Sequence, residues 1–288
     1  MKLGHWMGCC LLLEVAVGVT HAQTALQKEV LKTAEASMVL TGTIDVNPDG
    51  SLHGYTIDKR ERVPAEVASI VDRNVSHWTF KLSAPATDVI HTKMSLLVRA
   101  KPAGDGTYLV DVSGTSFGES DNKTGAWVSY KSRKQPAYPR DAVDARVSGT
   151  VFLVLRIGRE GTVEEAVVEQ VNLDRYGAKS AMESYRKMLA GASLRVAKDW
   201  TFNLPTHGNA VDNPYWEVRV PVKFFLVESG VTIADHPYGT WSPYFPGPRQ
   251  SPPWLSKALL SEAPDALPGE GLHAGDSGLQ LATPLGGA

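Results

Sequence analysis

Thiols and basic patches are scarce in this sequence. Only two of its 288 residues are cysteines, Cys9 and Cys10, and both lie in an apolar stretch at the N-terminus. The formal net charge is −2, and no basic stripe with interleaved aromatic residues suggests nucleic acid as a partner. The histidines show no metal-ligand spacing, and no glycine-rich loop is suited to cradle phosphate. We therefore expect no metal, no cofactor and no nucleic-acid site.

Long apolar runs are also scarce, and the one present has the pattern of a secretory signal peptide over residues 1–22. Lys2 gives a positive start, residues 6–19 are mostly apolar, and Ala22 is a small residue before a cleavage point. The alternative is an uncleaved membrane anchor. A spanning helix needs about 20 apolar residues, and Glu14 would cost roughly 2.5–3.5 kcal/mol near the bilayer centre. Cleavage is therefore favoured, and it would leave a mature chain without thiols.

The rest of the chain has a globular composition, with 43% hydrophobic and 21% charged residues, and its length allows one or two domains. Within it, the same order of predicted elements occurs twice. Gly42 to Phe80 contains a strand, a Pro-Asp-Gly turn, a second strand and a helix pattern that ends in Trp-Thr-Phe. Gly149 to Phe202 contains a strand, an Arg-Glu-Gly turn, a second strand and a helix pattern with the same ending. We interpret these stretches as two copies of one unit.

Each copy contains an amphipathic helix. Pro64 suits the first position of the first helix, and apolar residues then recur at helical spacing over residues 67–78. The second helix has a similar stripe over residues 181–189. Gly191 weakens this helix and could break it before Leu194.

A closing strand follows each helix, at residues 89–100 and 216–226. Apolar and polar residues alternate in the second of these, as expected for an antiparallel sheet with helices on one face. A further strand at residues 108–112 is expected to fold back on strand 89–100 and to occupy its outer edge. The predicted fold class is α+β, with two tandem small units. Each unit is an antiparallel sheet of three to four strands with a helix packed on one face.

The predicted organisation has five parts. The C-terminal part is rich in proline and glycine and has few apolar runs, so we expect it to be disordered. The parts are a signal peptide (1–22), a degenerate first unit (36–118), a linker (119–134), a second unit (135–230) and a disordered tail (231–288).

The second unit carries an ordered set of motifs. Gln135-Pro136-Ala137-Tyr138-Pro139 comes first, followed by the strand at residues 149–154 and a hairpin glycine at Gly161. Trp200-Thr201-Phe202 and Val218-Arg219-Val220-Pro221-Val222 complete the set. In this order, the motifs resemble the C-terminal domain of TonB-type energy transducers over roughly a third of the chain. The first copy resembles the same family more faintly.

The resemblance implies a periplasmic, non-enzymatic domain of Gram-negative bacteria that binds an outer-membrane TonB-dependent transporter. In that family the closing strand lends its open edge to an extended segment of the transporter, the TonB box, in support of energy-dependent transport. An unpaired strand edge can accept such a segment through backbone hydrogen bonds alone, and Pro221 fits an edge strand. The implied partner-binding residues are Gln135, Pro136, Tyr138, Pro139, Trp216, Val218, Val220, Val222 and Phe224.

Two alternatives remain. If the leader is kept, the chain would be an inner-membrane-anchored energy transducer that also contacts inner-membrane motor proteins. An envelope hydrolase using Ser116, in Gly114-Thr115-Ser116-Phe117-Gly118, is the second alternative, although that motif requires a helix directly after it and none is predicted. Four aromatic residues at the helix exits are assigned to the structural core: Trp78, Phe80, Trp200 and Phe202.

Overall fold

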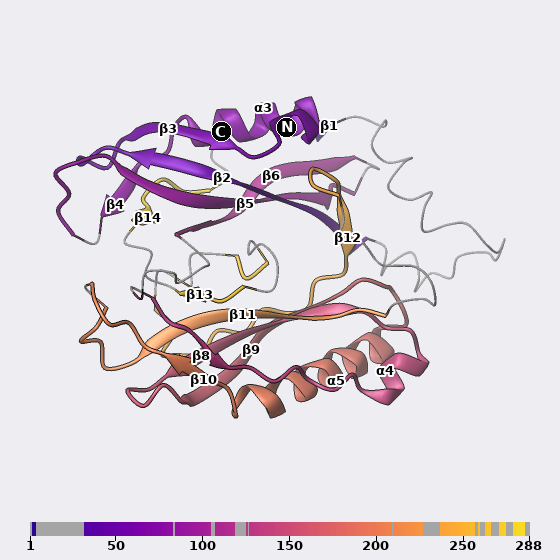
Figure 1. Ribbon diagram of the computed structural model, residues 1–288. Coiled ribbons are helices and arrows are strands. Elements are labelled where there is room, and N and C mark those ends of the chain that lie inside the picture. Colours follow the sequence, from indigo (N-terminus) through magenta and orange to yellow (C-terminus); the bar gives the residue numbers. More distant parts are fainter. Residues whose placement is uncertain are drawn as a thin grey trace.

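The protein contains two antiparallel sheets, each with a helix on its outer side, which confirms the predicted α+β fold (Figure 1). The two sheets lie one above the other, and C-terminal segments run between them (Figure 1). The computed structural model describes residues 2–3, 32–82, 84–104, 107–118, 125, 127–208, 210–226, 237–256, 259, 263–265, 271–274 and 279–285.

The first sheet has the strand order β6-β5-β2-β3. β2 and β3 form a hairpin through a turn in which Gly50 has a φ of 84°, a conformation that favours glycine. β6 folds back on β5 over its outer edge, as predicted for residues 108–112. The four strands are β2 (Glu35–Val46), β3 (Leu52–Ile57), β5 (Ile90–Pro102) and β6 (Tyr108–Phe117).

Helix α3 (Ala65–Val75) covers one face of this sheet, and Pro64 is its N-cap rather than its first residue, one position earlier than predicted. Its apolar stripe, which includes Val67 and Val71, packs against the alternate residues of β2 that face it. The short 3-10 helix η1 (Arg60–Arg62) precedes α3, and β4 (Phe80–Leu82) follows it.

The second sheet has the order β11-β8-β9, with the helices α4 and α5 below it in Figure 1. α5 is continuous through Gly191, so the possible break before Leu194 does not occur. Residues on both sides of that glycine, such as Leu189 and Ala192, are buried against the sheet, and this packing holds the helix together. The elements are β7 (Ser129–Ser132), α4 (Arg140–Asp144), β8 (Gly149–Ile157), β9 (Val163–Leu173), α5 (Lys179–Ala197), β10 (Thr201–Asn203) and β11 (Trp216–Phe224).

Both units close their hairpin turn against the helix exit in the same way. The N–H of Phe80 donates to the Gly50 carbonyl at 2.8 Å, and the N–H of Phe202 donates to the Gly161 carbonyl at 2.8 Å. A Cβ at Gly50 would lie 2.2 Å from the Phe80 oxygen, and one at Gly161 would lie 2.4 Å from the Phe202 oxygen. Glycine is therefore required at both turns because the helix exit approaches so closely.

The four aromatic residues at the helix exits lie in the two cores. In the first unit, the rings of Trp78, Phe80 and Phe117 pack edge to face. In the second unit, Tyr130 of β7 contacts both Trp200 and Phe202. The exposed fractions of the four predicted core side chains are small: Trp78 3%, Phe80 6%, Trp200 1% and Phe202 3%.

The prediction of a disordered tail is wrong for the C-terminal residues that the structure describes. Three short strands of this region pair with both units: β12 (Ser242–Tyr244) with β2, β13 (His273–Ala274) with β11, and β14 (Leu279–Leu281) with β4. The apolar residues of the region are few and widely spaced, but many of them are buried, such as Phe245 and Leu259. They add to cores that already exist, so the region does not need a core of its own.

The prediction of a linker over residues 119–134 is wrong for part of this range. Four of its residues form β7 (Ser129–Ser132), which pairs with β10 and belongs to the second unit. Residues 119–124 and 126 lie outside the described part of the chain.

At the N-terminus, β1 (Lys2–Leu3) pairs with β6 at Leu109 and Tyr108. The rest of the predicted signal peptide lies outside the described residues. Among the helices that the structure describes, none combines the length and apolar character needed to cross a bilayer.

Candidate partner-binding surface

β11 is held along its whole length by β8, in a register that runs from Trp216 opposite Ile157 to Phe224 opposite Gly149. Its alternate residues point toward α5 and are buried in the core of the second unit. They therefore fix the strand and offer no side chain to a partner, which leaves the outer backbone edge for recognition. These core residues are Trp216, Val218, Val220, Val222 and Phe224.

The outer edge of β11 is not free along its whole length. Val218 and Arg219 pair with Ala274 and His273 of β13 in antiparallel register. The expectation of an open closing edge is therefore wrong at these two positions. The pairing ends at Arg219, before Pro221, which has no N–H to donate to a neighbouring strand. Two residues give no periodic pattern, so the sequence could not reveal β13.

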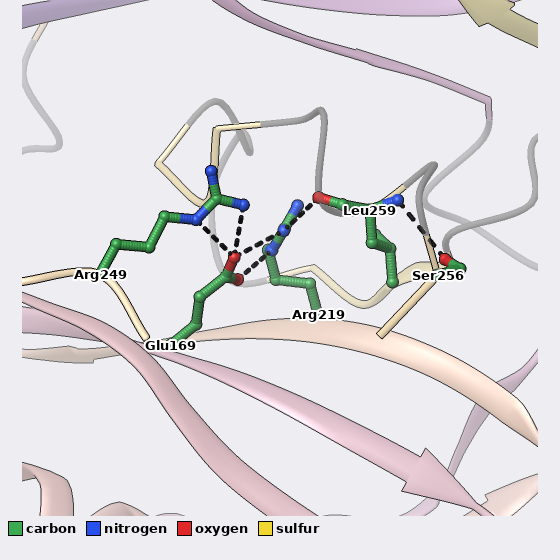
Figure 2. A network of polar contacts seen from close by, with 5 residues as sticks. All are labelled: Glu169, Arg219, Arg249, Ser256 and Leu259. Carbon is green, nitrogen blue, oxygen red and sulfur yellow. Dashed lines mark hydrogen bonds and ion pairs between the residues drawn. The ribbon is translucent and has the colours of Figure 1, made fainter. Parts of the chain in front are cut away.

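The sheet face opposite α5 is covered as well. On this face, Arg219 of β11 and Glu169 of β9 are both 0% exposed and form an ion pair with an Nε–Oε2 distance of 2.6 Å and an Nη2–Oε1 distance of 3.0 Å (Figure 2). Burying two charges is costly unless their hydrogen-bonding capacity is satisfied. Here Arg219 also donates to the Leu259 carbonyl at 2.9 Å.

A second guanidinium completes the site. Arg249, 35% exposed, donates to Glu169 Oε1 through Nη2 at 2.7 Å and through Nε at 3.0 Å (Figure 2).

The register of β8 and β9 shifts between Phe152, which pairs with Gln170, and Leu153, which pairs with Val168. Glu169 is thus the extra residue of a β-bulge, and bulges commonly redirect a side chain in this way.

The C-terminal region reaches this face along the outer edge of β9. Phe245 exchanges backbone hydrogen bonds with Leu173, at 2.7 and 3.1 Å, and the N–H of Gln250 donates to the Glu169 carbonyl at 2.7 Å. Arg186 of α5 donates to the Phe245 carbonyl at 3.2 Å. Burial lowers the pKa of Arg186 from its ordinary value. One edge and one face of the sheet are therefore both in contact with this region.

Beyond Gln250, the region crosses the face with one polar contact after another. Trp254 donates its indole N–H to Glu165 at 2.8 Å, and the backbone N–H of Ser256 donates to Glu217 at 2.9 Å. Leu255 and Leu259 pack with Val154 of β8 in a small buried cluster of their own. We call residues 249–256, 259 and 272–274 the covering segment.

The Gln-Pro-x-Tyr-Pro segment lies at the start of the second unit. Trp200 donates its indole N–H to the Lys134 carbonyl at 2.8 Å, which fixes the chain just before Gln135. Tyr138 donates its hydroxyl to the Val147 carbonyl and packs edge to face on Phe224, with ring centroids 5.3 Å apart. Burial raises the pKa of the Tyr138 phenol. Tyr138 therefore has a role in the fold.

Solvent exposure varies within this segment. Gln135 is exposed, and Pro136 and Pro139 are half-buried. Pro139 caps α4. A partner could therefore reach Gln135 directly, and contact by the other three residues stays a prediction.

The structure gives no support to the hydrolase motif. Ser116 lies within β6, opposite Ser95 of β5. A nucleophile elbow needs a sharp strand-to-helix turn, whereas Ser116 is part of a regular ladder. In the described part of the chain, no group of three or more His, Cys, Asp or Glu residues could hold a metal ion.

Sequence reasoning missed the polar site around Glu169 and the covering segment. Arg219 was a possible signal, because it is a charged residue within a strand rich in valine. Trp254 was another, because it is a large aromatic residue within a proline-rich stretch. Neither residue reveals its partner, since the contacts span between 40 and 89 positions of sequence.

The second unit is thus a small α+β domain whose closing strand, among the described residues, pairs on its outer side with the two residues of β13. Residues 134–226 match the family model described as the Gram-negative bacterial TonB protein C-terminal. The match begins at Lys134, whose carbonyl Trp200 fixes, and ends just after β11. It does not extend to the first unit. No curated protein and no solved structure matches the chain.

Proposed function

We propose that residues 134–226 form a TonB-type domain that binds an outer-membrane TonB-dependent transporter in the envelope of a Gram-negative bacterium. The observation that carries this proposal is the family match, which covers the second unit from α4 to β11. The protein would support energy-dependent transport by holding a periplasmic segment of the transporter. Binding, rather than catalysis, is the proposed activity, because the surface provides a strand edge and ionic contacts.

The proposed location is the periplasm, after removal of residues 1–22. N-terminal sequencing of the mature protein tests this directly. A start at Gln23 supports a periplasmic binding protein. A retained leader would instead mean an inner-membrane transducer that could contact inner-membrane motor proteins.

The first unit is proposed to be a second copy of the same module. Its support is the matching contact of Phe80 with Gly50 and of Phe202 with Gly161, together with the same order of elements. The equivalent of β11 in the first unit is β5, and its outer edge carries β6 over most of its length. We therefore assign partner binding to the second unit alone.

The test is capture of outer-membrane proteins from a Gram-negative bacterium by the immobilised full chain, with identification by mass spectrometry. The expected result is enrichment of TonB-dependent transporters. Gln135→Ala should reduce this enrichment, because Gln135 is an exposed polar residue of the Gln-Pro-x-Tyr-Pro segment. Ser184→Ala, at an exposed position of α5, is the matched control and should leave it unchanged. Absence of transporters from the captured fraction would refute the proposed function.

A further inference from the structure

The covering segment makes the contacts that an extended guest would make. It pairs with the β11 edge at Val218 and Arg219, and it places a backbone carbonyl, that of Leu259, on the Arg219 side chain. It also satisfies Glu217 with a backbone N–H from Ser256. Backbone contacts of this kind can be supplied by any extended polypeptide, whatever its side chains.

The outer edges of the two closing strands, β5 and β11, are occupied in different ways. The β5 edge is occupied by β6, a ten-residue strand that follows β5 after a short turn. The β11 edge is occupied by the two residues of β13, which return from far beyond the end of β11. A long local strand is a fixed part of its sheet. A two-residue pairing made by a distant segment can be exchanged for another strand at little cost to the rest of the sheet.

The covered face also suits exposure to water. Arg156, Glu165, Glu169, Glu217 and Arg219 carry charges that water would solvate if the segment left. The apolar contribution to this contact comes from the small cluster formed with Val154, which is separate from the main core of the second unit, and from Leu272, which packs into that core. Of the described residues of the segment, only Leu272 would then be lost from the core of the unit.

We infer that the covering segment is an internal ligand that occupies the partner-binding surface of the second unit, so that an extended segment of the partner binds only by displacing it. This inference rests on the proposed function for the nature of the partner. The tethered segment acts at a high effective concentration, on the order of millimolar for a flexible tether. It therefore excludes weak competitors and selects a partner that pairs over more of β11 than β13 does.

The test uses the full chain with Leu255→Asp/Leu259→Asp. These changes place carboxylates in the apolar cluster around Val154, which weakens the segment without altering the sheet. The probe is a fluorescent synthetic peptide with the sequence of residues 248–262, followed by fluorescence anisotropy. The variant should bind this peptide at least tenfold more tightly than the unchanged chain does.

A matched control is Ser251→Asp/Pro253→Asp, which adds the same charge at two exposed positions of the segment. It should bind the probe as weakly as the unchanged chain. Equal binding by all three proteins, or binding by none, would overturn the inference.

If circular dichroism shows that the aspartate variant does not fold, a disulfide lock gives the same test. The chain with Val154→Cys and Leu255→Cys, and with Cys9 and Cys10 changed to serine, joins two residues of one buried cluster. The reduced form should bind the peptide at least tenfold more tightly than the oxidised form. Equal binding by the two forms would contradict the inference.

Outer-membrane capture with the same proteins separates this inference from the proposed function. If the aspartate variant binds the peptide but no protein captures a transporter, the internal ligand stands and the proposed partner is wrong. If all proteins capture transporters equally and none binds the peptide, the proposed function stands and the internal ligand is refuted.

Discussion

The buried pair of Glu169 and Arg219 gives the sharpest test of how the C-terminal region is held. Glu169→Gln keeps the size of the side chain but removes the carboxylate that lies between two guanidinium groups, those of Arg219 and Arg249. Removing one partner of a buried ion pair typically costs about 3–5 kcal/mol. We expect a loss of this size in the free energy of unfolding of the second unit, because Arg219 is 0% exposed and cannot reach water.

The assay is equilibrium unfolding in urea, with a surface pair as reference. Glu164→Gln breaks the pair with Arg156, whose Nε lies 3.1 Å from Glu164 and whose side chain is partly exposed, and should cost about 0–1 kcal/mol. Glu169→Leu combined with Arg219→Met removes both buried charges. It should regain most of the loss, because apolar replacement of a whole buried pair is often neutral.

Equal losses for Glu169→Gln and Glu164→Gln would refute this reasoning, since they would show that Glu169 is not buried with Arg219 in solution. An intermediate loss, accompanied by uptake of the peptide of residues 248–262, has a different meaning. It would show that the covering segment detaches rather than leave the Arg219 charge buried beside a neutral glutamine. The size of the loss would then measure the free energy of detachment.

Gly161→Ala should destabilise the second unit by about 1–3 kcal/mol in urea unfolding, because Gly161 has a φ of 72° and a Cβ would lie 2.4 Å from the Phe202 oxygen. Gly191→Ala is the matched substitution in α5 and should stabilise the second unit by about 0.5–1 kcal/mol, because Gly191 lies within the helix with open space around it. A loss of stability in this variant would contradict the unbroken helix. Burial and a hydrogen bond to Asp72 raise the pKa of Tyr55 to about 12. The folded state therefore binds more protons than the unfolded state above pH 10, and the stability that Tyr55 contributes should be lost between pH 10 and pH 12. Tyr55→Phe should flatten this part of the stability–pH curve, and an unchanged slope would contradict the assignment.

Local signals predicted the framework of the fold because they act within a few residues. The Asp-Gly turn before Ser51, Pro64 at the start of α3 and the Trp-Thr-Phe helix exits each fix the backbone near their own position. The pairing of β6 with β5 was predictable for a related reason, since a short turn joins two alternating stretches. These features place the sheets and helices of both units.

The C-terminal region was not predictable from such signals because its order depends on surfaces supplied by other parts of the chain. Trp254 and Leu259 have no periodic apolar neighbours, so local composition indicates disorder. Each is nevertheless held by a residue of the second sheet, Trp254 by Glu165 and Leu259 by Arg219. Composition measures whether a segment can form its own core, and this segment does not need one.

The dependence of the covering segment on the surface of the second sheet also bears on function. A segment held by many separate, partly ionic contacts, by one small apolar cluster and by Leu272 is ordered only while its host surface is available. A partner that competes for that surface gains the β11 edge and releases the segment in one step. In the first unit no such exchange is available, because β6 is continuous with β5 through a short turn. The two units thus share an architecture, but only the second has a closing edge whose occupant can be replaced, and the family match falls on that unit.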